Sequence, residues 1–122
     1  MKEFLVIRNN ANWTRSASED IIYIHAAGNY SDIMLSLGEK VTVTMQIGEI
    51  FEEIERQLDY TVEDFVAVGR SLIINRKHLN HINLSTKELV LTDGISTFFT
   101  LKVDKEPLKR LKKLVENEKE SK

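Results

Sequence analysis

The chain has 122 residues, of which 42% are hydrophobic, and its formal net charge is −2. This size fits one domain with a hydrophobic core and leaves no room for a second. The absence of cysteine excludes disulfides, thiol catalysis and thiolate metal sites. No apolar run approaches the ~20 residues that cross a bilayer, and no secretion signal is present. We therefore expect a soluble protein of the cytoplasm.

The part of the chain before residue 46 is predicted to be β-strands joined by tight turns. Gly28-Asn29 forms one turn, because both residues tolerate positive φ, and Gly38-Glu39-Lys40 closes a hairpin. If the residues of each strand alternate strictly, Ile22 and Ile24 lie on the same face of the strand over 21–26. In the strand over 30–37, Leu35 and Leu37 likewise share a face. The predicted strands cover residues 3–8, 12–16, 21–26, 30–37 and 41–44.

Two amphipathic helices are predicted, one in the middle of the chain and one near its C-terminus. Thr44 is the expected N-cap of the first helix. Asp104 can cap the second, and Pro107 is tolerated there because it lies in the first turn. The apolar stripes are Ile47, Ile50, Phe51, Ile54 and Leu58 in the first helix, and Leu108, Leu111 and Val115 in the second.

Strand patterns also fill the region between the helices. Short strands are expected at 65–68 and 72–74, followed by a meander over 79–84, 89–91 and 96–101 with a turn at Asp93-Gly94. The predicted fold class is therefore mainly β with two flanking helices (α+β). It forms a single domain over 1–122, with a core of about 19–115 and a frayed tail over 116–122.

Charge is unevenly distributed along the chain. Residues 49–64 contain seven acids and one arginine, whereas residues 66–81 contain three cations and no acid. Those three cations, Arg70, Arg76 and Lys77, adjoin the apolar anchors of the run FVAVGRSLIINRKHL. Such a layout suits recognition of a polyanion such as DNA, provided that the acidic helix points away. The competing interpretation is that these charges are simply solvated.

Two sequence blocks resemble the LytTR family of bacterial DNA-binding domains. The first is IIYIHAAGNY, residues 21–30, and the second is F-x-x-x-x-R-S-x-x-I-N-x-x-H-L, residues 65–79, with the acidic helix between them. The resemblance covers about residues 19–115. The resemblance implies a β-rich fold whose interstrand loops enter the major groove of DNA. It also implies that the domain is the output domain of a transcriptional regulator, such as a two-component response regulator.

The resemblance also implies which residues contact DNA. Asn29, Tyr30 and Ser31 occupy the first contacting loop, Arg70 the second, and Lys102 follows the last strand. Each has a simpler interpretation: a self-capping turn for Asn29, a half-buried aromatic for Tyr30, and a helix-entry charge for Lys102. Arg76 and Lys77 are either phosphate contacts or solvated charges.

The chain departs from the family pattern in the second block. Ala67 and Gly69 stand where the family usually has arginine and histidine. This leaves two functions open. The first is sequence-specific duplex DNA binding in transcriptional regulation, and the second is a LytTR-like module for protein interaction or self-association with weakened or lost DNA binding. A steep loss of affinity with salt would distinguish the first from the second.

Catalysis and metal binding are not expected. His78-x-x-His81 resembles a ligand pair, but residues three apart in an extended segment point to opposite faces, and no carboxylate completes a site. No phosphate loop or nucleophile motif is present. The expected partner is duplex DNA, with no cofactor and no membrane. A homodimer on repeated sites, an upstream receiver domain or a separate signalling partner would fit this function.

Overall fold

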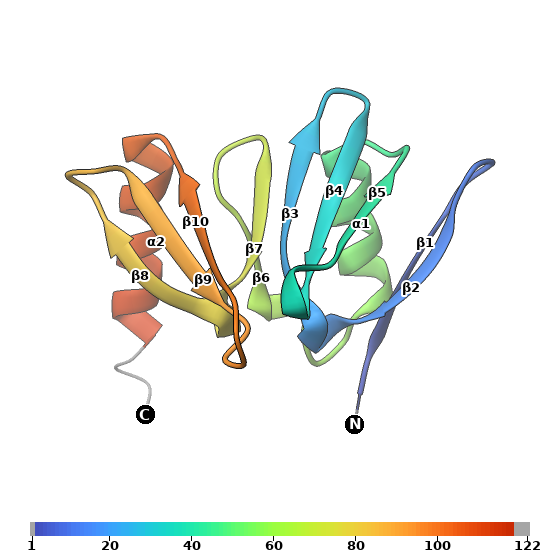
Figure 1. Ribbon diagram of the computed structural model, residues 1–122, viewed down its shortest axis with the longest axis horizontal. Coiled ribbons are helices and arrows are strands. Elements are labelled where there is room, and N and C mark those ends of the chain that lie inside the picture. Colours follow the sequence, from blue (N-terminus) through green and yellow to red (C-terminus); the bar gives the residue numbers. More distant parts are fainter. Residues whose placement is uncertain (1, 119–122) are drawn as a thin grey trace.

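The computed structural model describes residues 2–118, which form three antiparallel sheets and two α-helices (Figure 1). The sheets are a hairpin, β1–β2; a five-stranded sheet in the order β5-β4-β3-β7-β6; and a three-stranded sheet in the order β10-β9-β8. This arrangement confirms the predicted fold class. The elements are β1 (Phe4–Arg8), β2 (Trp13–Ala17), β3 (Ile21–Ala27), β4 (Tyr30–Leu35), β5 (Lys40–Val43), α1 (Ile47–Gln57), β6 (Phe65–Ala67), β7 (Leu72–Asn75), β8 (Leu79–Asn83), β9 (Glu88–Thr92), β10 (Phe98–Lys102) and α2 (Lys105–Glu118).

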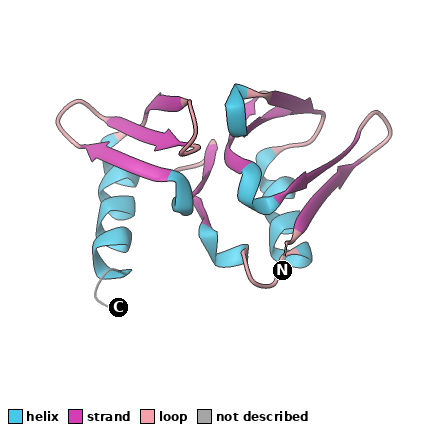
Figure 2. Ribbon diagram, turned by 60° about the horizontal axis from the view of Figure 1, so that its bottom comes forward, coloured by secondary structure: helices cyan, strands magenta, loops and turns pink. Residues whose placement is uncertain are grey.

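The five-stranded sheet is buried on both faces at its centre. On one face Ile24 and Ile73 pack into the α1 core, which includes Ile50 and Ile54 of the helix. On the other face Leu72 and Ile74 pack into the α2 core with residues of the three-stranded sheet and of α2. Figure 2 shows the helices on the two sides of the strands, and the hairpin packs on α1 by burying Leu5 and Ile7 in the α1 core. One sheet therefore supplies side chains to both cores.

Strand β3 does not alternate as the sequence predicts. Its pairing with β4 shifts between Ile21 and Tyr23, where an irregularity interrupts the register. As a result Ile22 packs in the α2 core and Ile24 in the α1 core, although simple alternation places them on one face. An extra residue in one strand reverses the side-chain phase, which period-two counting cannot detect.

Leu37 is not part of the strand in which the sequence predicts it. Strand β4 ends at Leu35, and residues 36–38 form a 3-10 turn in which Leu37 has a φ of +66°. Its side chain is 63% exposed and does not share a buried face with Leu35. The backbone N–H of Leu37 donates to the Asp93 carboxylate at 2.8 Å, which holds this turn against the β9–β10 loop.

The helix boundaries correct two further predictions. Gln46, not Thr44, is the N-cap of α1, and it forms a reciprocal capping box with Glu49. Helix α2 starts directly after Asp104, whose carbonyl accepts from the Leu108 N–H at 3.2 Å. It continues to Glu118, so residues 116–118 of the predicted tail are helical, and residues 119–122 lie outside the described part. No helix within 2–118 has the length and apolarity to cross a membrane.

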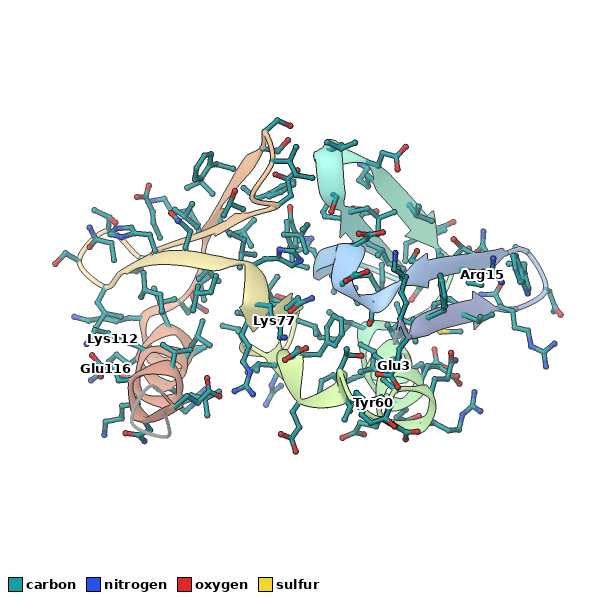
Figure 3. All side chains as sticks on the ribbon, turned by 90° about the horizontal axis from the view of Figure 1, so that it is seen from below. Glu3, Arg15, Tyr60, Lys77, Lys112 and Glu116 are labelled. Carbon is teal, nitrogen blue, oxygen red and sulfur yellow. The ribbon has the colours of Figure 1, made fainter. Side chains whose placement is uncertain are left out.

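The first described residues are anchored to the loop that follows α1. The Glu3 carboxylate accepts hydrogen bonds from the Thr61 hydroxyl at 2.7 Å and from the backbone N–H groups of Asp59, Tyr60 and Thr61 at 2.7 to 2.9 Å. These hydrogen bonds lower the pKa of Glu3 from 4.5 to about 2. The bond from the Thr61 hydroxyl has the largest effect, and the backbone donors add to it. Glu3 and Tyr60 are labelled in Figure 3, where they lie close together although they are far apart in the sequence.

The buried face of α1 predicts an ordered series of stability losses. Ile54 is fully buried, whereas Phe51 on the same helix is only partly buried. Ile54→Ala should lower the free energy of unfolding by about 2–5 kcal/mol, because it removes core contacts and leaves a cavity. Phe51→Ala should lower the free energy of unfolding by less than the loss of a fully buried aromatic side chain would, and by less than Ile54→Ala does. Urea denaturation of both variants checks the order, and a larger loss for Phe51→Ala would contradict this packing.

The Glu3 contacts predict an acid-dependent contribution to stability. A folded-state pKa lowered from 4.5 to about 2 stabilises the fold fully above pH 4.5, and this contribution is lost as pH falls towards 2. The difference in unfolding free energy between the native chain and Glu3→Gln should therefore be largest above pH 4.5 and shrink below it. Urea titrations at several pH values measure this. A difference that does not change between pH 6 and pH 3 would rule the linkage out.

Candidate nucleic-acid interface

Three chain segments meet at one end of the molecule, which we call the loop edge: residues 28–29, 68–71 and 102–104 (Figure 1). The register of the central sheet explains the first two. His25 of β3 pairs with Leu72 of β7, and the Ala26 N–H donates to the Ser71 carbonyl at 2.9 Å. The β3–β4 turn and the β6–β7 loop are therefore direct neighbours.

The β6–β7 loop has a well-defined backbone. The N–H of Val68, which is buried, donates to the Leu72 carbonyl at 2.8 Å, and Gly69 closes the turn with a φ of +74°. A Cβ at position 69 would lie 3.5 Å from the Pro107 side chain, so the loop rests against the start of α2. Arg70, next in the chain, is exposed and forms no hydrogen bond or ion pair with residues 2–118.

Arg70 and Lys102 line the same hollow, of about 390 Å³, between the β6–β7 loop and the β10–α2 connection. His25 and Asp104 line it as well. The Lys102 ammonium donates to the Thr86 carbonyl at 2.9 Å and lies 3.8 Å from the Glu88 carboxylate. Because it is directed to the β8–β9 turn, a phosphate in the hollow would have to compete with these two oxygens.

Asn29 and Tyr30 form the exposed tip of the β3–β4 hairpin. Gly28 enters the turn with a φ of +68°, which leaves Asn29 at the outer end. Tyr30 is 51% exposed. Neither side chain makes a hydrogen bond within the described chain, so both keep their polar groups available to a ligand.

Ser31 does not belong to this exposed set. Its side chain is fully buried, and its hydroxyl donates to the Met45 carbonyl at 2.7 Å. The sequence-based assignment of Ser31 to the contacting loop is therefore wrong in this structure. Residues alternate across a strand, so Ser31 points inward where Tyr30 points outward. Its hydroxyl instead links β4 to the segment that leads into α1.

Arg76 and Lys77 also lie away from the loop edge. They follow β7 at the end opposite to Arg70, and Figure 3 shows Lys77 on the face seen from below. Arg76 forms an ion pair with Glu118 of α2. Their proximity to Arg70 in sequence does not bring them to the same surface, because the whole of β7 separates them.

Two neighbouring residues in the second block act structurally. Asn75 is buried, donates to the carbonyls of Ile21 at 3.0 Å and Ser18 at 3.3 Å, and accepts from the Lys77 N–H. The ring nitrogens of His78 lie 3.0 Å from the Thr92 carbonyl and 2.7 Å from that of Glu19. Both imidazole nitrogens are therefore engaged, and the described residues contain no cluster of three or more potential metal ligands.

The acidic helix α1 reaches the β6–β7 loop with one of its acidic side chains. Glu52 of α1 lines a shallow hollow together with Ala67 and Arg70. The condition that the acidic helix points away from the basic loop is therefore not met at Glu52. His25 is a residue that sequence reasoning did not place here, although it belongs to the first block and is exposed at the end of β3.

Comparisons with known proteins found one matching family model and a solved structure with a similar fold. The family model of the LytTr DNA-binding domain matches residues 12–116. A solved structure, described as the LytTr DNA-binding domain of a methyl-accepting/DNA response regulator from Bacillus cereus, is similar with a TM-score of 0.62 and 18% identity. The match covers 94% of this chain and 98% of that one. No curated protein sequence matches the chain.

Proposed function

The chain belongs to the family of LytTr DNA-binding domains, and on this premise we propose that it binds specific sites on duplex DNA through the loop edge and thereby regulates transcription. The observation that carries the proposal is the placement of Asn29, Tyr30 and Arg70. These three side chains come from two neighbouring loops, are exposed, and have no partner within the described chain. Catalysis plays no part in this function.

The proposed mechanism separates positioning from sequence recognition. An arginine guanidinium can donate to two acceptors of a guanine in the major groove, and an asparagine amide can do the same with adenine. Arg70 and Asn29 are our candidates for these contacts. Lys102 and the Tyr30 hydroxyl are better suited to phosphates, because a single donor on a phosphate sets register without reading sequence.

The alternative function keeps the fold and replaces the DNA by a protein partner. Two observations favour it: Ala67 and Gly69 supply no polar side chain to the loop, and the Glu52 carboxylate lies on the same side as Ala67. Both reduce the positive potential that a phosphate backbone requires. We therefore expect native binding of DNA to be weak.

The input to this regulator is also part of the proposal. The similar structure from Bacillus cereus is described as part of a response regulator. By analogy, a receiver domain or a separate signalling protein of a bacterial two-component system would control this chain in the cytoplasm. Two copies would bind repeated sites side by side.

Removing the Arg70 side chain tests the proposed function against a matched control. Arg70→Ala should weaken binding to a selected site by about 1–3 kcal/mol if the guanidinium contacts a base, and random duplexes should lose less. Lys77→Ala removes one charge at the opposite end and should leave affinity nearly unchanged. Fluorescence anisotropy with labelled duplexes measures both. Equal losses for the two variants would show that only overall charge matters.

Introducing an arginine at position 67 tests the alternative. Ala67 is exposed on edge strand β6, and Ala67→Arg should strengthen binding at low salt and steepen the slope of log K against log salt by about 0.9 per phosphate. Ala67→Gln is the uncharged control. Position 69 is unsuitable, because its φ of +74° strains any other side chain. If Ala67→Arg and Ala67→Gln bind alike, residue 67 does not face the DNA.

A further inference from the structure

We propose that the tip of the β1–β2 hairpin is an additional DNA contact, in which Arg8 and Trp13 bind the sugar-phosphate backbone of the duplex that flanks the loop edge. This inference rests on the proposed DNA-binding function. It adds a contact outside the three segments of the loop edge. The sequence resemblance starts at about residue 19 and assigned no role to these residues.

The hairpin tip is held in place by its own side chains. The Asn9 side-chain oxygen accepts from the N–H groups of Ala11 and Asn12 at 3.0 and 2.9 Å, which closes the turn. The Asn9 amide then donates to the Thr44 carbonyl at 2.5 Å, and the Thr44 N–H donates to the Asn12 side chain at 2.9 Å. Two asparagines thus join the tip to the residue that follows β5.

This attachment places the tip in line with the loop edge. Val43 of β5 pairs with Ser31 of β4, so Thr44 lies beside Tyr30 at the end of the central sheet. The hairpin forms a sheet of its own, and the side chains of Asn9 and Asn12 join its tip to Thr44 at this end of the central sheet. One turn of B-DNA is ~34 Å long, so a single duplex that lies along this end can contact both the β3–β4 turn and the hairpin tip.

The chemistry of the hairpin suits a phosphate backbone. Residues 4–17 include Arg8 and Arg15 and no acidic residue. Arg8 pairs across the strands with Trp13, which is 65% exposed and offers an indole N–H donor. Arg8 forms no ion pair with the described residues. Glu53, the acid that shares a hollow with it, is already bound by Arg56 and Gln57.

Charge complementarity favours duplex DNA over a second copy of the chain. An apolar partner that covered Trp13 would also desolvate the unpaired Arg8 guanidinium, which costs free energy unless a new anion compensates it. A phosphate supplies that anion, and the indole can pack on the adjoining sugar. Arg15 is less available, because its guanidinium lies 5.0 Å from the centre of the Phe4 ring. It provides the control position.

Trp13 is the single tryptophan of the chain, so its fluorescence reports on this site alone. The experiment titrates the native chain with a selected duplex that extends half a helical turn beyond the site on each side. Trp13 emission should change over the same duplex concentrations that change the anisotropy of a labelled duplex. Arg8→Gln should flatten the slope of log K against log salt by about 0.9, and Arg15→Gln should leave it nearly unchanged.

Other outcomes overturn the inference in distinguishable ways. If the duplex binds while Trp13 emission and the Arg8→Gln slope stay unchanged, the hairpin contact is absent and the proposed function stands. If emission changes with protein concentration in the absence of DNA, the hairpin contacts a second copy instead. If only single-stranded DNA changes the emission, the ligand is not the duplex. If no duplex binds at all, the proposed function and this inference fail together.

Discussion

The burial of β3 and β7 on both faces is the constraint on which the rest of the structure depends. All four residues of β7 are buried, and its apolar side chains alternate between the α1 core and the α2 core. A strand between two cores cannot slip by one residue without exchanging its side chains between them. The backbone on either side of β7 is therefore fixed as well. This rigidity presents Arg70 at one end and buries Asn75 at the other.

Polar contacts complete the arrangement by fixing the three-stranded sheet to the central one. The Asp93 carboxylate accepts from the N–H groups of Ile95, Leu37, Thr97 and Ser96, which together hold its pKa well below the ordinary value. His78 joins the carbonyls of Thr92 and Glu19. The bonds to Leu37 and Glu19 join different segments of the chain, so they fix the three-stranded sheet against the central sheet.

The electrostatic design of the loop edge is mixed. Arg70 has no partner in the described chain, whereas Lys102 is directed to oxygens of the β8–β9 turn, and Asp104 and Glu52 lie close by. A surface of this kind would rely on a few well-placed donors, with only a weak general attraction for phosphate. In our proposal, the hairpin, which carries arginines and no acid over residues 4–17, would add phosphate contacts beside this mixed surface.

The sequence by itself determined the types of the elements, the two apolar helix stripes and the exposed turn at Asn29, because periodicity and turn chemistry are local properties. It also predicted that Arg70 is an exposed cation between buried anchors, which are Val68 and Leu72. Only the tertiary structure decided which residues share a surface. It separated Arg76 and Lys77 from Arg70, turned Ser31 inward, and moved Glu52 beside the loop. The irregularity in β3 and the pairing of Asn9 and Asn12 with Thr44 depend on contacts between distant segments, which no local pattern encodes.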